Sequence, residues 1–334
     1  CWARHHWLLA KWRKWHMSDK ICPACVLGVD VGGTKIRYGL VSTEGKILAW
    51  EEYESHSLPA DAWIKTLFSQ IDPFWARYRS VVTPIAAGMG IRGSVDHLRQ
   101  RLRSSSVILD AGSCDICRMV SERYGIPAFI ENDVKAATLY ELMFGVGQRE
   151  KTFACVNVGT GLSMGLVLDG KLVHGMNNNA GEIGNMLFQR CDNGEIVSIE
   201  SVASGQGMEL ERSRLENSSD SSRIPRGGRS LAAACKSGDP FAKKIIDTLI
   251  LQLALLLLNL EAGFDIGTYI LAGGVMSDPW MRERLCAEIT TLSAQAQKGV
   301  FKWNARIAVS ELGAGNVGLC GSACVALYKL RNVT

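Results

Sequence analysis

The sequence predicts an α/β protein built from two similar lobes that face each other across a cleft. Apolar strands alternate with helical segments along the chain, which is typical of α/β proteins. A β-hairpin with a glycine-rich turn occurs twice, about 126 residues apart, and such an internal duplication indicates two related halves. The length of 334 residues also suggests about two domains.

The N-terminal lobe is expected over residues 17–140, together with a C-terminal helix at about 318–331 that returns to it. Short apolar runs between turn residues predict its strands, and apolar side chains at helical spacing predict its helices. Pro73 is expected to interrupt one helix, because proline has no backbone N–H to donate. The expected strands are 26–31, 36–41, 47–53, 82–91 and 127–133, and the expected helices are 60–79 and 133–145.

The C-terminal lobe is expected over residues 141–317. The apolar stretch 245–260 predicts a long helix in the core or at a dimer contact. Residues 212–230 are rich in serine and arginine, which predicts a mobile surface loop. The other expected elements are the second hairpin at 152–175, a buried strand before Gly273 and Gly274, and a helix that opens near Pro279.

The turns of the two hairpins predict a phosphate site. Asp30 in the first hairpin corresponds to Asn157 in the second, and Gly32 corresponds to Gly159. Glycine turns bind anions through backbone N–H groups, because no side chain blocks the approach. Two such turns facing each other would surround the triphosphate of ATP. The expected nucleotide-binding residues are Asp30, Gly32, Gly33, Thr34, Lys35, Gly159, Thr160, Gly161, Gly273 and Gly274.

Several of these residues have a specific expected role. Asp30 would hold Mg²⁺ through water, since this ion usually takes one or two carboxylates plus phosphate oxygens. Thr34 and Thr160 would add hydroxyl donors. Lys35 would offset phosphate charge, although an exposed strand lysine explains it nearly as well. The Gly273-Gly274 pair would let adenosine lie on the backbone, with a simple strand-to-helix turn as the alternative.

Six motifs occur in a fixed order along the chain: DVGGTK (30–35), GMGIRGSVD (88–96), ENDVKAA (131–137), NVGTGLS (157–163), NAGEIGNM (179–186) and LAGGV (271–275). In this order they resemble the ROK family of sugar kinases, from about Val26 to about Tyr328. That family belongs to the actin-like ATPase superfamily, which also contains hexokinase. The resemblance implies two RNase H-like lobes of the actin/hexokinase type, ATP in the cleft between them, and phosphorylation of a sugar hydroxyl.

The resemblance also implies roles for individual residues. The catalytic aspartate of the family falls on Asp133, which would accept the proton of the sugar hydroxyl as a general base. Residue chemistry alone leaves open whether Asp133 instead caps the helix that follows. The implied sugar-binding residues are Gly93, Asn132, Glu182, Asn185 and Glu200. The primary hydroxyl, O6, is the expected acceptor.

Three departures from the family pattern lie on the sugar side. Asn185 replaces a histidine that commonly binds both sugar and zinc, and Cys191 is the only cysteine left of the zinc motif. One cysteine and one asparagine cannot make a closed tetrahedral zinc site, so we expect no zinc. The sugar-binding Asn-Leu turn of the family has no clear counterpart in 101–115. Glucose and N-acetylmannosamine are therefore both expected candidates.

The charge and hydropathy patterns limit the expected partners. The net charge of +4 is concentrated in residues 1–20, so the rest of the chain is neutral and lacks the basic face that nucleic acid requires. The apolar run within 245–263 is shorter than the roughly 20 residues of a membrane span. We expect a small-molecule sugar and a second copy of the chain in a homodimer, and neither nucleic acid nor a membrane.

Residues 1–16 differ from the rest, with four of the nine tryptophans and three of the six histidines. They are expected to be a non-native or unstructured leader, with a basic amphipathic membrane anchor as the alternative. Eleven cysteines without a signal-peptide pattern predict free thiols and a cytoplasmic protein. The Cys-x-x-Cys pairs at 22–25 and 114–117 are expected to be packing thiols.

Two other functions are weighed against a kinase. The Gly-x-Gly-x-x-Gly runs at 88–93 and 313–318 would suit an NAD-dependent oxidoreductase, but neither is followed by the second strand and acidic residue of a dinucleotide-binding unit. A non-catalytic sugar-binding sensor of the same family is the stronger alternative, because the sugar side is altered. About 25 residues precede the first strand, too few for a helix-turn-helix domain.

Overall fold

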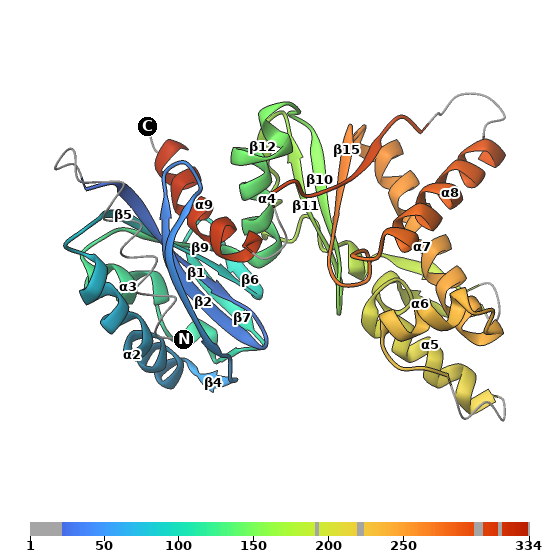
Figure 1. The fold of residues 1–334 in the computed structure, drawn as a ribbon, viewed down its shortest axis with the longest axis horizontal. Helices are drawn as coiled ribbons and strands as arrows, with labels where there is room; N and C mark the ends of the chain where they lie inside the picture. The colour runs from blue at the N-terminus through green and yellow to red at the C-terminus, as the bar shows by residue number, and fades with distance from the viewer. Residues whose placement is uncertain (1–21, 191–193, 219–223, 297–302, 313–315, 333–334) are drawn as a thin grey trace.

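The computed structural model describes residues 22–190, 194–218, 224–296, 303–312 and 316–332. It contains two five-stranded sheets with the same strand order (Figure 1). The first follows β3-β2-β1-β5-β9, and the second follows β12-β11-β10-β15-β16. Their bounds are β1 (Ala24–Val31), β2 (Lys35–Ser42), β3 (Ile47–Glu54), β5 (Thr83–Ile91), β9 (Ala128–Asn132), β10 (Phe153–Val158), β11 (Leu162–Leu168), β12 (Lys171–Leu172), β15 (Thr268–Ala272) and β16 (Arg306–Val309).

The two sheets also agree in strand direction. In each, three antiparallel strands are followed by two parallel ones. Asp30 on β1 pairs with Arg37 on β2, and Asn157 on β10 pairs with Ser163 on β11. The expected α/β architecture is thus confirmed, with the duplicated hairpin forming the first two strands of each sheet.

Helices and small sheets complete the two halves. The helices are α2 (Ala60–Tyr78), α3 (Ile116–Tyr124), α4 (Asp133–Phe144), α5 (Gly205–Ser218), α6 (Gly228–Lys236), α7 (Pro240–Phe264), α8 (Pro279–Ala296) and α9 (Val317–Asn332). The short strands pair as β4 (Leu58–Pro59) with β8 (Ile108–Leu109), β6 (Gly93–Asp96) with β7 (Arg101–Ser105), and β13 (Leu187–Gln189) with β14 (Ile196–Ser198).

Helix α9 returns from the second half of the chain and packs on β1 and β5 of the first sheet (Figure 1). Close packing depends on glycines that face it. A Cβ on Gly88 would lie 2.0 Å from the carbonyl oxygen of Ser322, and one on Gly28 would lie 2.8 Å from that of Leu319. Helix α4 packs on α9 and on β11, so these two helices lie between the sheets. The sheet and helix contacts thereby fix the walls of the cleft.

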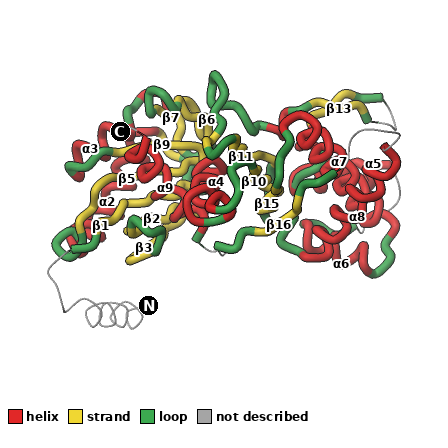
Figure 2. The backbone as a smooth tube through the Cα atoms, turned by 90° about the horizontal axis from the view of Figure 1, so that it is seen from above, coloured by secondary structure: helices red, strands yellow, loops and turns green. Residues whose placement is uncertain are grey.

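Helix α7 is, by length and composition alone, the one helix in the described ranges long and apolar enough to cross a membrane. Its apolar side chains instead form much of the second core, including Leu249, Leu253 and Leu257. Figure 2 shows α5, α6 and α8 grouped around it at the end of the molecule away from the first sheet. Of the two settings expected for this helix, the core is confirmed, and a dimer contact stays a prediction.

Two local expectations are wrong. Helix α2 runs through Pro73 without interruption, because Trp63, Leu67 and Phe74 anchor its buried face in the first core. Burial of such side chains outweighs the backbone hydrogen bond that proline removes.

The expected loop at 212–230 is helical at both ends. Helix α5 extends to Ser218 and α6 begins at Gly228, while residues 219–223 lie outside the described part. The charged residues that suggested a loop are paired: Arg212 contacts Glu209 and Glu216 at helical spacing. Such pairs stabilise a helix instead of opposing it.

Candidate functional site

A cavity of about 810 Å³ lies where the two halves meet. Its walls come from the ends of β5 and β9 and from the turn and loops around β10 and β11. Eight of the expected site residues line it: Gly93, Asn132, Asp133, Thr160, Gly161, Glu182, Asn185 and Glu200. The other lining residues are Arg92, Ser94, Val134, Asn157, Leu162, Ser163, Asn178 and Asn179.

Asp133 is the first residue of α4, directly after β9. The N-cap of this helix is Asn132, whose Oδ1 accepts hydrogen bonds from the backbone N–H groups of Val134 at 3.0 Å and Lys135 at 3.2 Å. Asp133 is therefore not needed as the cap, and its carboxylate lies at the cavity. Burial raises its pKa, while the N–H of Val134 and the charge of Arg92 act in the opposite direction. A raised pKa suits a carboxylate that accepts a proton near neutral pH.

Asp30 lies near the end of β1 and is not among the residues that line the cavity. Burial raises its pKa to about 6, and the nearby charge of Asp133 adds to this effect. Gly318 at the start of α9 makes room for it, because a Cβ there would lie 2.1 Å from Oδ2 of Asp30. Asp30 and Asp133 together offer carboxylate oxygens, which are the ligands that a divalent cation such as Mg²⁺ prefers.

The two glycine turns are tight. The N–H of Gly32 donates to the carbonyl of Lys35 at 3.1 Å, and the N–H of Gly159 donates to that of Gly161 at 3.0 Å. Thr160 and Gly161 line the cavity, whereas Gly32, Gly33, Thr34 and Gly159 do not. The side chain of Lys35 forms an ion pair with Glu52 on the neighbouring strand, which is how an exposed strand lysine behaves.

Gly273 has a positive φ of 89° and lies against the end of β10. A Cβ there would lie 2.4 Å from the carbonyl of Val158 and 2.8 Å from Oδ1 of Asn157. Only glycine fits this approach. Gly274 has open space around the position of a Cβ. Neither glycine lines the cavity itself, and Gly273 lies beside Val158, where the second turn begins.

Glu200 is held by the second turn. Its Oε2 accepts a hydrogen bond from the N–H of Leu162 at 2.7 Å. Gly161 and Gly184 leave space for this carboxylate, because a Cβ on them would lie 2.5 Å and 3.1 Å from the same oxygen. Glu182 opens the short helix Ile183–Asn185, which brings the side chains of Glu182 and Asn185 to the same wall. This wall is rich in groups that accept hydrogen bonds from hydroxyls.

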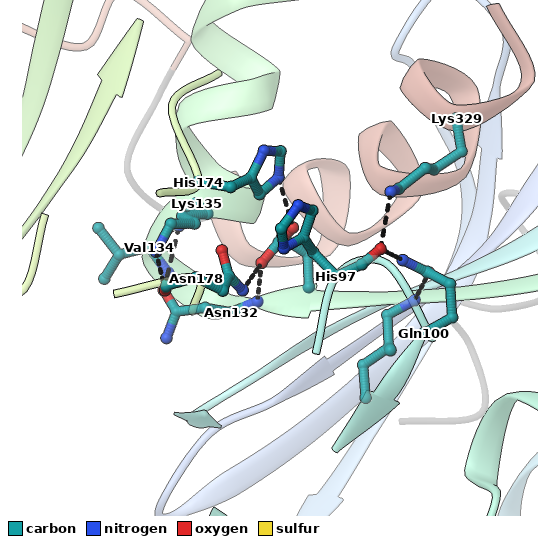
Figure 3. Close-up of polar contacts among 10 residues, drawn as sticks. His97, Gln100, Asn132, Val134, Lys135, His174, Asn178 and Lys329 are labelled. Carbon is teal, nitrogen blue, oxygen red and sulfur yellow. Dashed lines mark hydrogen bonds and ion pairs between the residues drawn. The ribbon is translucent and has the colours of Figure 1, made fainter. Parts of the chain in front are cut away.

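Sequence reasoning missed a buried polar network, drawn in Figure 3, which includes Asn132 and Asn178 of the cavity wall. Glu131 on β9 is 1% exposed. Its Oε2 lies 3.0 Å from Nε2 of His174, and its Oε1 accepts from Nδ2 of Asn178 at 2.8 Å. Lys135 is 2% exposed, and its Nζ donates to the carbonyl of Asn178 at 2.9 Å. His97 stacks on His174, with ring centroids 4.2 Å apart.

This network joins the two halves, because Glu131 and Lys135 belong to β9 and α4 whereas His174 and Asn178 follow β12. Burial raises the pKa of Glu131, but hydrogen bonds from His174 and Asn178 hold it below its usual value. Asn178 has a positive φ of 61°, which asparagine tolerates better than most residues. The ENDVKAA motif contains Glu131 and Lys135, yet nothing in the sequence near His174 indicates its partner.

The Gly-x-Gly-x-x-Gly run at 88–93 lies within β5 and enters β6, not a helix. A dinucleotide-binding turn opens a helix instead. Residues 313–315 of the second run and Cys191 lie outside the described part of the chain.

Residues 26–328 match the family model described as the ROK family. The chain therefore belongs to the ROK family, and the resemblance noted from its motifs is confirmed. It is 28% identical over 267 residues to a glucokinase of Streptomyces coelicolor, covering 75% of this chain and 82% of that protein. It is 25% identical over 229 residues to the DNA-binding transcriptional dual regulator NagC of Escherichia coli, covering 66% of this chain and 56% of that protein.

Two solved structures are similar over most of the chain. The ROK hexokinase from Thermus thermophilus has a TM-score of 0.76 at 25% identity, covering 92% of this chain and 99% of that one. The ROK family glucokinase from Streptomyces griseus, in complex with glucose and AMPPNP, has a TM-score of 0.67 at 26% identity, covering 90% and 98%. The fold is thus the two-lobed, RNase H-like fold of the actin/hexokinase type.

Proposed function

We propose that the protein is an ATP-dependent sugar kinase that phosphorylates a hydroxyl of a hexose or N-acetylhexosamine, with Asp133 as the general base. The observation that carries this proposal is the position of Asp133. Its carboxylate lies at a cavity that also holds Glu182, Glu200 and the turn at Thr160. Membership of a family with glucokinases among its curated relatives supports the same activity.

The acceptor hydroxyl would lie against Asp133, which takes its proton as the oxygen attacks phosphorus. The primary hydroxyl, O6, is the proposed acceptor. Asn132, Glu182 and Glu200 would accept or donate hydrogen bonds to the remaining hydroxyls. Asn185 and the backbone of Gly93 complete this wall. Glucose and N-acetylmannosamine are the first candidates, and ROK relatives include a bifunctional NanE/NanK enzyme as well as glucokinases.

ATP would lie between the turns at 32–34 and 159–161, with adenosine beside Gly273 and Gly274. Asp30 would hold Mg²⁺, which neutralises charge on the phosphates when it is bound. Carboxylate oxygens such as those of Asp30 and its neighbour Asp133 are the ligands that Mg²⁺ takes, and the charge of the ion would offset the burial that raises both pKa values. Zinc is not part of this proposal, because the sequence retains too few zinc ligands around Asn185.

The proposal extends to where the protein works and to its partners. A neutral body and free cysteines favour a cytoplasmic enzyme without nucleic-acid or membrane partners. A homodimer is proposed because Leu251 and Leu255, each a little over a third exposed, lie on the outer face of the apolar helix α7. Size-exclusion chromatography with light scattering tests the dimer directly.

The activity is tested by a coupled assay of ADP release with glucose, N-acetylglucosamine, N-acetylmannosamine, mannose, fructose and allose. One sugar should give turnover, and Asp133→Asn should lower kcat at least about 1,000-fold while the sugar still binds. Asp169→Asn is the matched control, because Asp169 lies on an exposed turn with a positive φ that asparagine also accepts. Full turnover in Asp133→Asn would remove this residue from the mechanism.

A sugar-binding sensor without catalysis is the second candidate, favoured by the similarity to NagC. It predicts sugar binding by calorimetry together with no ADP release for any member of the panel. ATP binding without any NAD binding would separate both candidates from an oxidoreductase.

A further inference from the structure

Arg92 is held at the junction of three strands. Its N–H donates to the carbonyl of Val31 at the end of β1, at 3.3 Å. Its own carbonyl accepts from Oγ of Ser105 on β7, at 2.8 Å. These contacts fix the backbone of Arg92 between the first glycine turn and the wall of the cavity, while its side chain remains exposed. A fixed backbone limits where the guanidinium can reach.

Arg92 differs in charge from the acidic residues that line the cavity. Asp133, Glu182 and Glu200 all line it, and Arg92 is the one basic residue among the described residues that do. None of the ion pairs found in the described ranges involves its guanidinium. An arginine that no carboxylate neutralises, placed in a cavity of acidic groups, is available to a negatively charged ligand.

The guanidinium of Arg92 lies near the first glycine turn and near the carboxyl of Asp133. Its Nη1 is 3.3 Å from the position that a Cβ on Gly33 would occupy, so it stands over the first glycine turn. Its charge also acts directly on the carboxyl of Asp133. Arg92 therefore lies between the turn proposed for the phosphates and the proposed base.

We propose that Arg92 is a further catalytic residue, whose guanidinium binds the phosphoryl group as it passes from ATP to the sugar. This inference rests on the proposed kinase function. The sugar oxygen forms a bond to the γ-phosphorus, and its proton goes to Asp133. The bond from that phosphorus to the β–γ bridging oxygen breaks, and its electron pair leaves with ADP. The planar fork of Arg92 donates to the equatorial oxygens, on which charge accumulates.

A negatively charged acceptor, such as a sugar acid, is the competing explanation for an arginine here. Three carboxylates on the acceptor side oppose it, because each would repel an anion bound among them. The contact with the Gly33 turn also places Arg92 on the phosphate side. The geometry thus favours the phosphoryl group as its ligand.

The test compares Arg92→Ala and Arg92→Lys with the wild type. Arg92→Ala should lower kcat at least about 100-fold, as loss of an arginine that stabilises a phosphoryl group does, and leave the Kd for the sugar within about twofold. Arg92→Lys should recover only part of the rate, because lysine lacks the planar fork. Added guanidinium chloride at low concentration should partly restore Arg92→Ala. Arg99→Ala, an exposed arginine on the β6–β7 turn, is the matched control.

Nucleotide binding gives a readout that does not depend on turnover. Arg92→Ala should weaken binding of AMPPNP more than binding of ADP, because only the former has a γ-phosphate. The proposal for Arg92 would be overturned if Arg92→Ala kept the wild-type kcat and the wild-type ratio of AMPPNP affinity to ADP affinity. Loss of activity in Asp133→Asn in the same assay would leave the kinase proposal standing. Loss confined to sugar affinity would assign Arg92 to an anionic acceptor instead. A wild type without turnover on any sugar would overturn the kinase proposal itself.

Discussion

Glu131 Oε2 lies 3.0 Å from Nε2 of His174, and this contact links strand β9 of the first sheet to the loop after β12 of the second. The same carboxylate holds Asn178 and the N–H of Asn132, at 2.8 Å and 2.9 Å. One buried group therefore supports residues on both walls of the cavity. The contact therefore ties the two halves of the molecule together beside the cavity.

The first prediction concerns this buried carboxylate. Glu131→Gln keeps the shape of the side chain but replaces an acceptor oxygen with a donor, which leaves at least one buried partner unsatisfied. We expect the free energy of unfolding to fall by about 2–3 kcal/mol and the KM for the sugar to rise. Urea denaturation and steady-state kinetics measure the two effects.

Glu122→Gln is the control, because Glu122 is 67% exposed on α3 and should change neither quantity. The stability supplied by Glu131 should also depend on pH. Its pKa is lowered in the folded protein, so the contribution is complete above the usual value of 4.5 and is lost as the pH falls below it. Equal stability of wild type and Glu131→Gln at neutral pH would contradict the role of the contact.

The second prediction concerns Asp30, whose pKa is raised to about 6. A carboxyl with a raised pKa favours the folded state when protonated, so stability falls as the pH rises from the usual value of 3.8 to about 6 and stays lower above it. Asp30→Asn should therefore be more stable than the wild type at pH 8, by roughly 1–2 kcal/mol, and about equally stable at pH 4. Urea denaturation without Mg²⁺ at the two pH values measures this.

The same variant should lose most of its turnover if Asp30 holds Mg²⁺. Raising the Mg²⁺ concentration should stabilise the nucleotide-bound wild type but not Asp30→Asn. Equal stability of the two proteins at pH 8 would mean that the carboxylate is not strained by burial and by Asp133.

The third prediction concerns Gly161, which makes room for Glu200. A Cβ on Gly161 would lie 2.5 Å from Oε2 of Glu200, so Gly161→Ala must displace that carboxylate from the N–H of Leu162. We expect the KM for the sugar to rise by about tenfold, which corresponds to the loss of roughly one hydrogen bond to a charged group.

Gly263→Ala is the matched control. Gly263 lies in α7 with nothing within 4 Å of the position of its Cβ, and alanine there should raise stability slightly because it favours helix. An unchanged KM for the sugar in Gly161→Ala would argue that Glu200 does not contact the acceptor.

Local patterns in the sequence predicted most of the architecture. Alternating apolar residues and glycine turns predicted the two hairpins, and β1, β2, β10 and β11 lie where those signals placed them. The same signals failed at Pro73, because the buried face of α2 packs on residues distant in sequence. They failed in 212–218 because the charged residues there pair at helical spacing, and Glu211 also pairs with the distant Arg190.

By itself, the sequence determined the duplicated α/β plan, which follows from short-range patterns of apolar residues and turns. The order of the ROK motifs is also read from the sequence, and the resemblance that it carries supplied the candidates Asp133, Glu182 and Glu200. Only the tertiary structure decided that Asn132 caps α4 in place of Asp133, that Lys35 pairs with Glu52, and that Arg92 stands over Gly33. Such contacts join segments that are far apart along the chain, and their geometry arises only when the two sheets and the helices between them pack together.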